Sequence, residues 1–146
     1  MSYVDLNPIR EGMAKTPESS DHTSIKLRAK CFAEDSERQP EHLMPLIGQN
    51  LLSDNNGIAF KTKDYLELVD WTGRQIRDNP IGSIDEEAPP ILQRLSISPK
   101  HWIYLCTQFE SRFKGIAGTA ESLKQNLNLF KLVRRPNIKN SVLLFS

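Results

Sequence analysis

The side chains with the most obvious capacity for chemistry stand at the start of the chain. Tyr3 offers a phenol that can act as a nucleophile, and Asn7 offers a carboxamide that can bind a metal ion. Residues four apart lie on the same face of a helix, so a helix through Tyr3 places these side chains next to each other. Pro8 has no N–H and disfavours the α region for Asn7, so we expect the helix to end or kink there. Asp5, two positions from Tyr3, then points away from it and is a poor candidate base.

The same stretch also has a purely structural interpretation. A tyrosine at helical spacing from Leu6 is commonly a packing residue of an amphipathic helix, and Asn-Pro commonly terminates a helix. Spacing alone therefore leaves both interpretations of Tyr3 open.

Residues 3–12 read Tyr-Val-Asp-Leu-Asn-Pro-Ile-Arg-Glu-Gly. This run resembles the catalytic helix of the single-tyrosine HUH transposases, in particular the REP-associated branch of the insertion-sequence-200-like family. Glu11 stands where that family usually has a small residue. Two later segments, residues 21–25 and 64–74, look like the C-terminal extension of bacterial members. The resemblance covers residues 2–128.

The resemblance implies DNA transposition through a phosphotyrosine intermediate. Tyr3 would be the catalytic nucleophile, Asn7 the third ligand of a divalent metal ion (Mg²⁺ or Mn²⁺), and Arg10 a DNA contact. The implied partner is single-stranded DNA or a DNA hairpin. The family takes its other two metal ligands from a His-hydrophobic-His pair on an upstream strand. This chain has no such pair, because its three histidines, His22, His42 and His101, are far apart in sequence.

A tyrosine that attacks a phosphate needs a cation to neutralise the developing negative charge, so the chain cannot build the family's site alone. We interpret it as the C-terminal portion of such a transposase, without the HUH half and inactive as this chain. The alternative is a non-enzymatic helical module that binds protein or DNA. Separation from an upstream half would expose the apolar side of the first helix, so reduced solubility or a homodimer is expected.

Composition favours one cytoplasmic domain with no membrane partner. At 146 residues the chain can bury a single core, and no run approaches the roughly 18 apolar residues of a membrane span. Cys31 and Cys106 lack metal-binding spacing and are expected to be reduced thiols. The formal net charge of +1 argues against strong electrostatic attachment of the whole chain to DNA. Residues 131–146 are exceptional, since they carry four basic and no acidic side chains.

Hydrophobic periodicity predicts a mainly α fold, a small irregular domain of about five helices. The resemblance implies that this domain is preceded by the end of a catalytic helix from a truncated α/β HUH domain. We divide the chain into residues 1–19, which end the catalytic domain with the tyrosine helix, residues 20–130, a helical C-terminal extension, and residues 131–146, a basic and apolar tail that could be disordered.

Capping residues and apolar stripes place the individual helices. The predicted spans are from among residues 20–23 to about 33, then 62–77, 90–95, 99–114 and 120–130. The helix over 62–77 has the clearest stripe, and Gly73 within it indicates close packing of another element. Its aromatic residues, Tyr65 and Trp71, could stack on bases but are expected in the core. Asn56-Gly57 indicates a turn, with a small hairpin around it.

Overall fold

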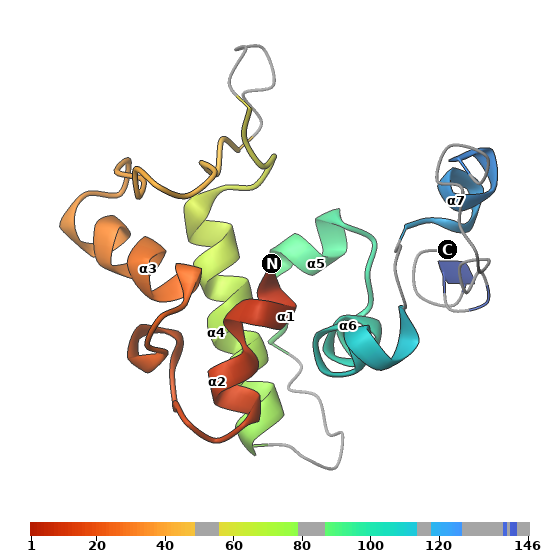
Figure 1. Cartoon of the computed structure of the whole chain (residues 1–146), viewed down its shortest axis with the longest axis horizontal. Coiled ribbons are helices and arrows are strands. Elements are labelled where there is room, and N and C mark those ends of the chain that lie inside the picture. Colours follow the sequence, from red (N-terminus) through yellow and green to blue (C-terminus); the bar gives the residue numbers. More distant parts are fainter. Residues whose placement is uncertain (49–55, 79–86, 114–117, 127–138, 140, 143–146) are drawn as a thin grey trace.

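The chain is mainly helical (Figure 1). The computed structural model describes residues 1–48, 56–78, 87–113, 118–126, 139 and 141–142, and no strand occurs within them. The elements are α1 (Ser2–Asp5), α2 (Asn7–Arg10), the 3-10 helix η1 (Pro17–Ser19), α3 (Ser24–Glu34), α4 (Thr62–Asp78), α5 (Pro90–Arg94), α6 (Pro99–Arg112) and α7 (Ala120–Asn126). In the described part five helices follow residue 20, as predicted.

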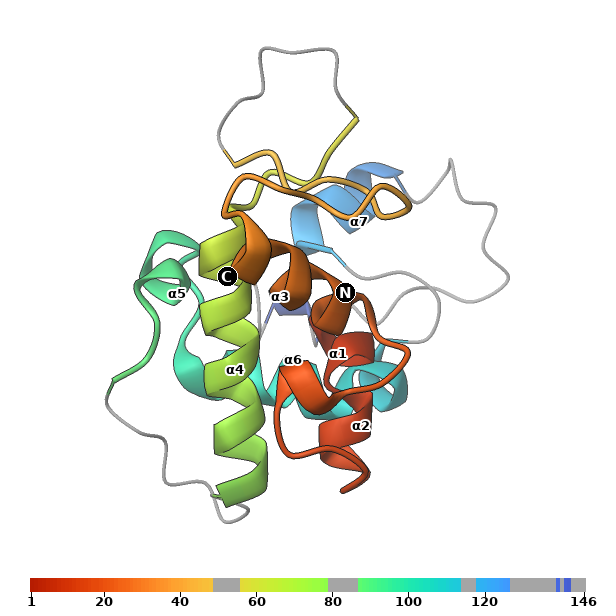
Figure 2. The ribbon, with the colours of Figure 1, turned by 90° about the vertical axis from the view of Figure 1, so that its left-hand side faces the viewer.

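The 17-residue helix α4 packs against α2, α3 and α6. Figure 2 shows α5 on one side of it and α1 and α2 on the other, with α3 crossing nearby. The predicted apolar stripe explains this position, because Tyr65, Leu68, Val69 and Thr72 are all buried. Trp71 is buried as well, so both aromatic residues of α4 belong to the core, as expected. Helix α7 lies at the opposite end of the molecule from α3 (Figure 1).

Helix starts follow the capping residues read from the sequence. The Thr23 hydroxyl accepts a hydrogen bond from the Lys26 N–H at the start of α3, and Ser98 accepts one from the His101 N–H at the start of α6. Pro99 occupies the first position of α6, where its missing N–H costs nothing. These local signals need no tertiary contact, which is why they could be predicted.

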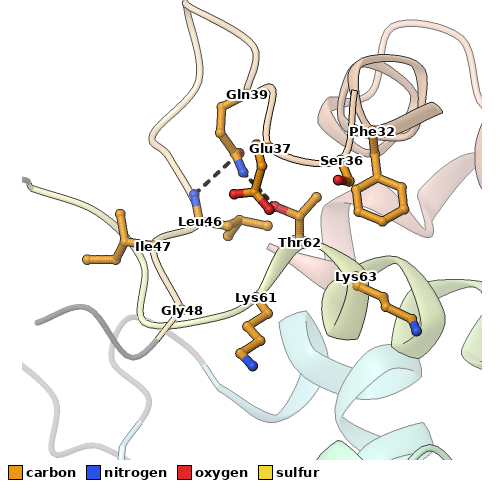
Figure 3. Close-up of a pocket in the computed structure, with 10 residues that line it drawn as sticks. All are labelled: Phe32, Ser36, Glu37, Gln39, Leu46, Ile47, Gly48, Lys61, Thr62 and Lys63. Atoms are coloured by element: carbon orange, nitrogen blue, oxygen red, sulfur yellow. Dashed lines mark hydrogen bonds between the residues drawn. The ribbon is translucent and has the colours of Figure 1, made fainter. Parts of the chain in front are cut away.

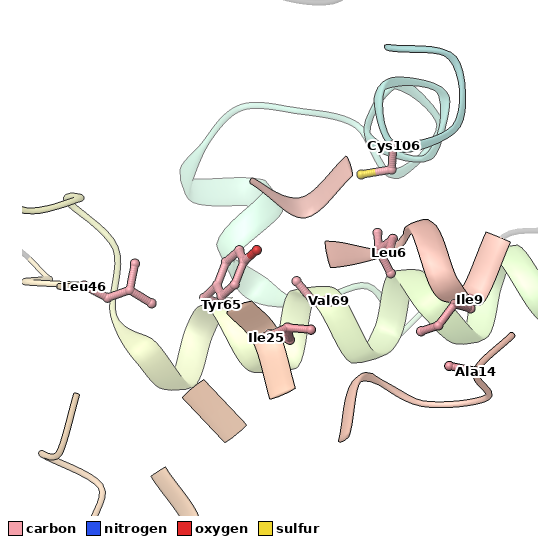
Figure 4. Packing of buried hydrophobic residues seen from close by; sticks show 8 residues of the cluster. All are labelled: Leu6, Ile9, Ala14, Ile25, Leu46, Tyr65, Val69 and Cys106. Atoms are coloured by element: carbon pink, nitrogen blue, oxygen red, sulfur yellow. The ribbon is translucent and has the colours of Figure 1, made fainter. Parts of the chain in front are cut away.

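The core joins the first helices to α3, α4 and α6 (Figure 4). Its buried hydrophobic residues are Leu6, Ile9, Ala14, Ile25, Leu46, Tyr65, Val69 and Cys106. A Cβ added at Gly73 would lie 3.0 Å from Cδ1 of Ile9, so α2 packs directly over this glycine. The prediction that another element covers Gly73 is confirmed.

The hairpin predicted around Asn56-Gly57 lies partly outside the described residues, because its first strand would fall within residues 49–55. Leu46 and Ile58 form an isolated parallel bridge, with the Ile47 N–H donating to Ile58 O and the Ile58 N–H to Pro45 O. This pairing is not the antiparallel one of a hairpin. Most of the predicted tail also lies outside the described part, in which only its residues 139, 141 and 142 are included. None of the helices in the described ranges is both long and apolar enough to cross a bilayer.

Candidate functional site

Tyr3, Asn7 and Arg10 occupy one face of a kinked pair of short helices. Leu6 separates α1 from α2 with φ −87° and ψ −4°, and its N–H still donates to Ser2 O at 2.9 Å. The predicted interruption of the helix is present, since α1 ends at Asp5 and α2 begins at Asn7. Asn7, however, does not leave helical conformation, as we expected from Pro8, but begins α2. The reason is that Pro8 falls in the first turn of a new helix, where a proline needs no hydrogen-bond partner.

Arg10 holds Tyr3 and Asn7 together. Its guanidinium Cζ lies 3.8 Å from the centroid of the Tyr3 ring, a cation–π geometry. Its Nη2 donates to Asn7 Oδ1 at 2.6 Å, and its Nη1 donates to Cys106 O at 2.9 Å and to Tyr3 O at 3.3 Å. The phenol and the carboxamide thus lie on the same face, as predicted, with a fixed positive charge between them.

Tyr3 and Asn7 also line the same cavity, of about 340 Å³. The other lining residues are Val4, Pro8, Asp21, His22, Thr23 and Glu110. The Lys26 ammonium, by its hydrogen bond and its charge, holds the pKa of Asp21 below the ordinary carboxyl value. His22 is exposed and has a φ of 60°, and Thr23, not His22, provides the cap of α3.

The opposite face of α1 is anchored by Asp5, which is only 2% exposed. Asp5 Oδ1 accepts hydrogen bonds from the Ser24 hydroxyl at 2.6 Å and from the Ile25 N–H at 3.1 Å, and Oδ2 accepts one from the Tyr65 hydroxyl. The carboxylate therefore ties α1 to the first turn of α3 and to α4. Asp5 does point away from Tyr3, as predicted, but its anchoring role was missed. Its two long-range partner helices leave no local signal in the sequence.

Burial makes the phenol of Tyr65 a very weak acid. Desolvation raises the Tyr65 pKa well above its ordinary value, and the negative charge of Asp5 raises it further. Cys106, beside the same core, also has a raised thiol pKa, of about 12, because it is buried. Neither group is poised to act as a nucleophile near neutral pH, because a thiol or phenol must first lose its proton.

The described residues do not fit a resident divalent metal ion. The Asn7 oxygen that would bind the ion already accepts a hydrogen bond from the Arg10 guanidinium, whose positive charge would oppose a second cation there. Across the described part, no three His, Cys, Asp or Glu side chains are grouped so as to hold a metal. The metal chemistry that the resemblance implies would therefore need ligands from outside these residues.

A second, mainly apolar cavity of about 340 Å³ adjoins the Tyr3 site. It shares Tyr3 and Val4 with the first cavity, and is further lined by Met1, Ser2, Ile58, Phe60, Tyr65, Leu68, Trp102, Leu105, Cys106 and Phe109. The Phe109 ring lies 5.7 Å from the Tyr3 ring, centroid to centroid. This groove joins residues from α1, α4 and α6, and it was not predicted, because the spacing within each helix does not show how the helices meet.

Comparison of the chain with models of protein families, with curated proteins and with solved structures gave no match. The catalytic role of Tyr3, the metal-ligand role of Asn7 and the DNA-contact role of Arg10 consequently stay predictions from the sequence.

Proposed function

We propose that the chain is the C-terminal portion of a single-tyrosine transposase that cuts and joins single-stranded DNA through a phosphotyrosine link, and that it is inactive on its own. The observation that carries the proposal is the placement of Tyr3 and Asn7 on the wall of one cavity. A nucleophile and a metal ligand must face the same reacting phosphate, so residues pointing into different spaces could not serve this chemistry.

The Asp5 anchor supports the proposal. A nucleophile works only if its helix is held in a fixed position, and Asp5 connects α1 to α3 and α4 through three hydrogen bonds. The bond from Arg10 to Cys106 O adds a connection to α6. In an intact transposase, Arg10 would have to release Asn7 Oδ1 before a metal ion could bind there, and an upstream His-x-His strand would supply the missing ligands.

The test starts from the coding DNA upstream of Met1. If it encodes an in-frame His-x-His strand, a protein extended through that strand should attach covalently to single-stranded DNA in the presence of Mg²⁺ or Mn²⁺, and the 146-residue chain should not. The attached product would be detected as a complex that survives denaturing electrophoresis. Tyr3→Phe in the extended protein should abolish attachment, and a Tyr3→Phe protein that still attaches would end the assignment.

The alternative, a non-enzymatic helical module, is favoured by the apolar groove beside Tyr3. Val4, on its rim, is 68% exposed and Met1 is 46% exposed. Contiguous exposed apolar surface commonly marks a protein-binding site. A homodimer that Val4→Asp converts to monomer in size-exclusion chromatography with light scattering would support this function. A well-behaved monomer at all concentrations, with no salt-sensitive binding to single-stranded oligonucleotides, would count against both kinds of module.

A further inference from the structure

A cavity of about 600 Å³ opens where the end of α3, the loop over residues 36–48 and the start of α4 meet (Figure 3). It is lined by the apolar side chains of Phe32, Leu46 and Ile47, by the polar side chains of Ser36, Gln39 and Thr62, by the charged side chains of Glu37, Lys61 and Lys63, and by Gly48. None of them lines the two cavities that contain Tyr3. The volume falls in the range of sites that hold small molecules.

The polar wall of this cavity is fixed by a hydrogen-bond network from the interior. The Gln39 Nε2 donates to Thr62 Oγ1 at 2.6 Å, and its Oε1 accepts from Arg28 Nη1 at 3.4 Å and from the Leu46 N–H at 3.5 Å. Arg28 is itself buried and donates to Met44 O at 2.9 Å. The amide is therefore held in one orientation before any ligand arrives. Because a carboxamide nitrogen carries two hydrogens, Thr62 leaves one of them for a ligand.

The charge of the lining favours an anion. Lys61 and Lys63 flank Thr62 at the start of α4, against the single negative charge of Glu37. Lys63 also pairs with Glu67 at 3.7 Å, but both side chains are at least half exposed, and such a surface pair contributes little. Lys63 can therefore turn toward a ligand. Lysine ammonium groups are common partners of phosphate.

The apolar part of the lining favours a planar ring. Phe32 is half-buried, so part of its ring faces the cavity, and Leu46 and Ile47 add apolar surface. Aromatic side chains stack on nucleobases irrespective of base identity. Glu37 and the free Gln39 hydrogen can meet the polar edge of a ring or the hydroxyl of a sugar.

From these residues we propose that the cavity binds an organic phosphate with a planar ring, the chemistry of a nucleoside monophosphate. The phosphate lies between Lys61 and Lys63, and the ring packs against Phe32. The inference goes beyond the proposed function, because it involves neither Tyr3 nor Asn7. Its failure would leave the transposase proposal standing, and the reverse also holds.

The experiment is a titration of the ¹⁵N-labelled full chain with deoxyadenosine monophosphate, deoxyadenosine and inorganic phosphate, followed by amide NMR. The monophosphate should shift the amides of Gly48 and Thr62 and saturate, and should bind about tenfold more tightly than either fragment alone, because it uses both parts of the lining. The double variant Lys61→Gln/Lys63→Gln should lose about tenfold in affinity for the monophosphate. The matched control is Lys100→Gln/Lys124→Gln, which changes the same charge at exposed positions outside the cavity and should bind normally.

Phe32→Leu tests the contact with the ring separately from the contact with the phosphate. This variant should bind the monophosphate about three- to tenfold more weakly and bind inorganic phosphate with unchanged affinity. Its thermal unfolding is measured to confirm that it is folded. A Lys61→Gln/Lys63→Gln protein that binds like the wild type overturns the proposal, as does inorganic phosphate binding as tightly as the monophosphate. A 5′-phosphorylated oligonucleotide tests whether the ligand is a DNA end or a free nucleotide. Tighter binding than that of the free monophosphate indicates a DNA end, and equal binding indicates a free nucleotide. Either result supports the site.

Discussion

The two faces of α1 place a tyrosine in opposite surroundings. On one face the Tyr65 hydroxyl donates to the buried carboxylate of Asp5, and burial raises its pKa. On the other, the half-buried Tyr3 ring lies under the Arg10 guanidinium and lines an open cavity. The first tyrosine holds the helix in place, and the second is displayed by it. The same side chain therefore stabilises the fold or faces a cavity, depending on what covers it.

The largest effect should come from removing the anchor. Asp5→Ala leaves the Ser24 hydroxyl, the Ile25 N–H and the Tyr65 hydroxyl without their acceptor, so we expect a loss of about 3–5 kcal/mol in the free energy of unfolding. Urea denaturation monitored by circular dichroism measures it. If Asn7→Ala, on the face that carries Tyr3, lowers the free energy of unfolding as much as Asp5→Ala does, the two faces do not differ in this way.

The two tyrosines can be compared by the same substitution. Tyr65→Phe removes a hydrogen-bond donor from the buried carboxylate of Asp5 and should lower the free energy of unfolding by about 1–2 kcal/mol. Tyr3→Phe keeps the ring contacts with Arg10 and Phe109 and should change the free energy of unfolding by less than about 0.5 kcal/mol. Equal losses from the two variants in urea denaturation would mean that both hydroxyls are structural.

The buried face should also lose stability in alkali. Cys106 has a folded pKa of about 12 against an ordinary value of 9.0, so above pH 9 the unfolded thiol releases its proton first. The unfolded state then binds fewer protons than the folded state, and the stability falls as pH rises. Between pH 8 and 10 we expect a loss of about 1 kcal/mol from this group. Cys106→Ala should flatten this part of the pH profile, and Tyr65 adds a dependence in the same direction. An unchanged profile for Cys106→Ala would show that burial does not control the thiol.

A modest effect should come from removing the guanidinium on the Tyr3 face. Arg10→Met removes the stacking on Tyr3 and the hydrogen bond to Cys106 O, so we expect the free energy of unfolding to fall by about 1 kcal/mol. Arg74→Met is the matched control, since Arg74 is exposed and its ion pair with Asp70, at 3.2 Å, is a surface pair worth below about 0.5 kcal/mol. A loss for Arg10→Met no larger than for the control in thermal unfolding would mean that Arg10 does not hold Tyr3.

Much of the helical fold could be predicted because its signals are local. The stripe of α4 and the caps at Thr23 and Ser98 depend on residues within one or two turns. The parallel bridge between Leu46 and Ile58 was not predicted, for the complementary reason. Asn56-Gly57 is a strong turn signal, but whether neighbouring segments pair, and in which direction, depends on the surface they meet, and here Leu46 is buried in the core beside Ile58.

Local sequence signals were enough to predict where helices begin, that Tyr3 and Asn7 share a helix face, and that the histidines offer no metal pair. Periodicity and capping chemistry act over a few residues, so they can be read directly from the chain. The anchoring of the helix by Asp5 and the bond from Arg10 to Cys106 depend instead on how the helices pack. The bonds concerned join residues 19, 60 and 96 positions apart, and such partners meet only when packing of the apolar stripes brings their helices together.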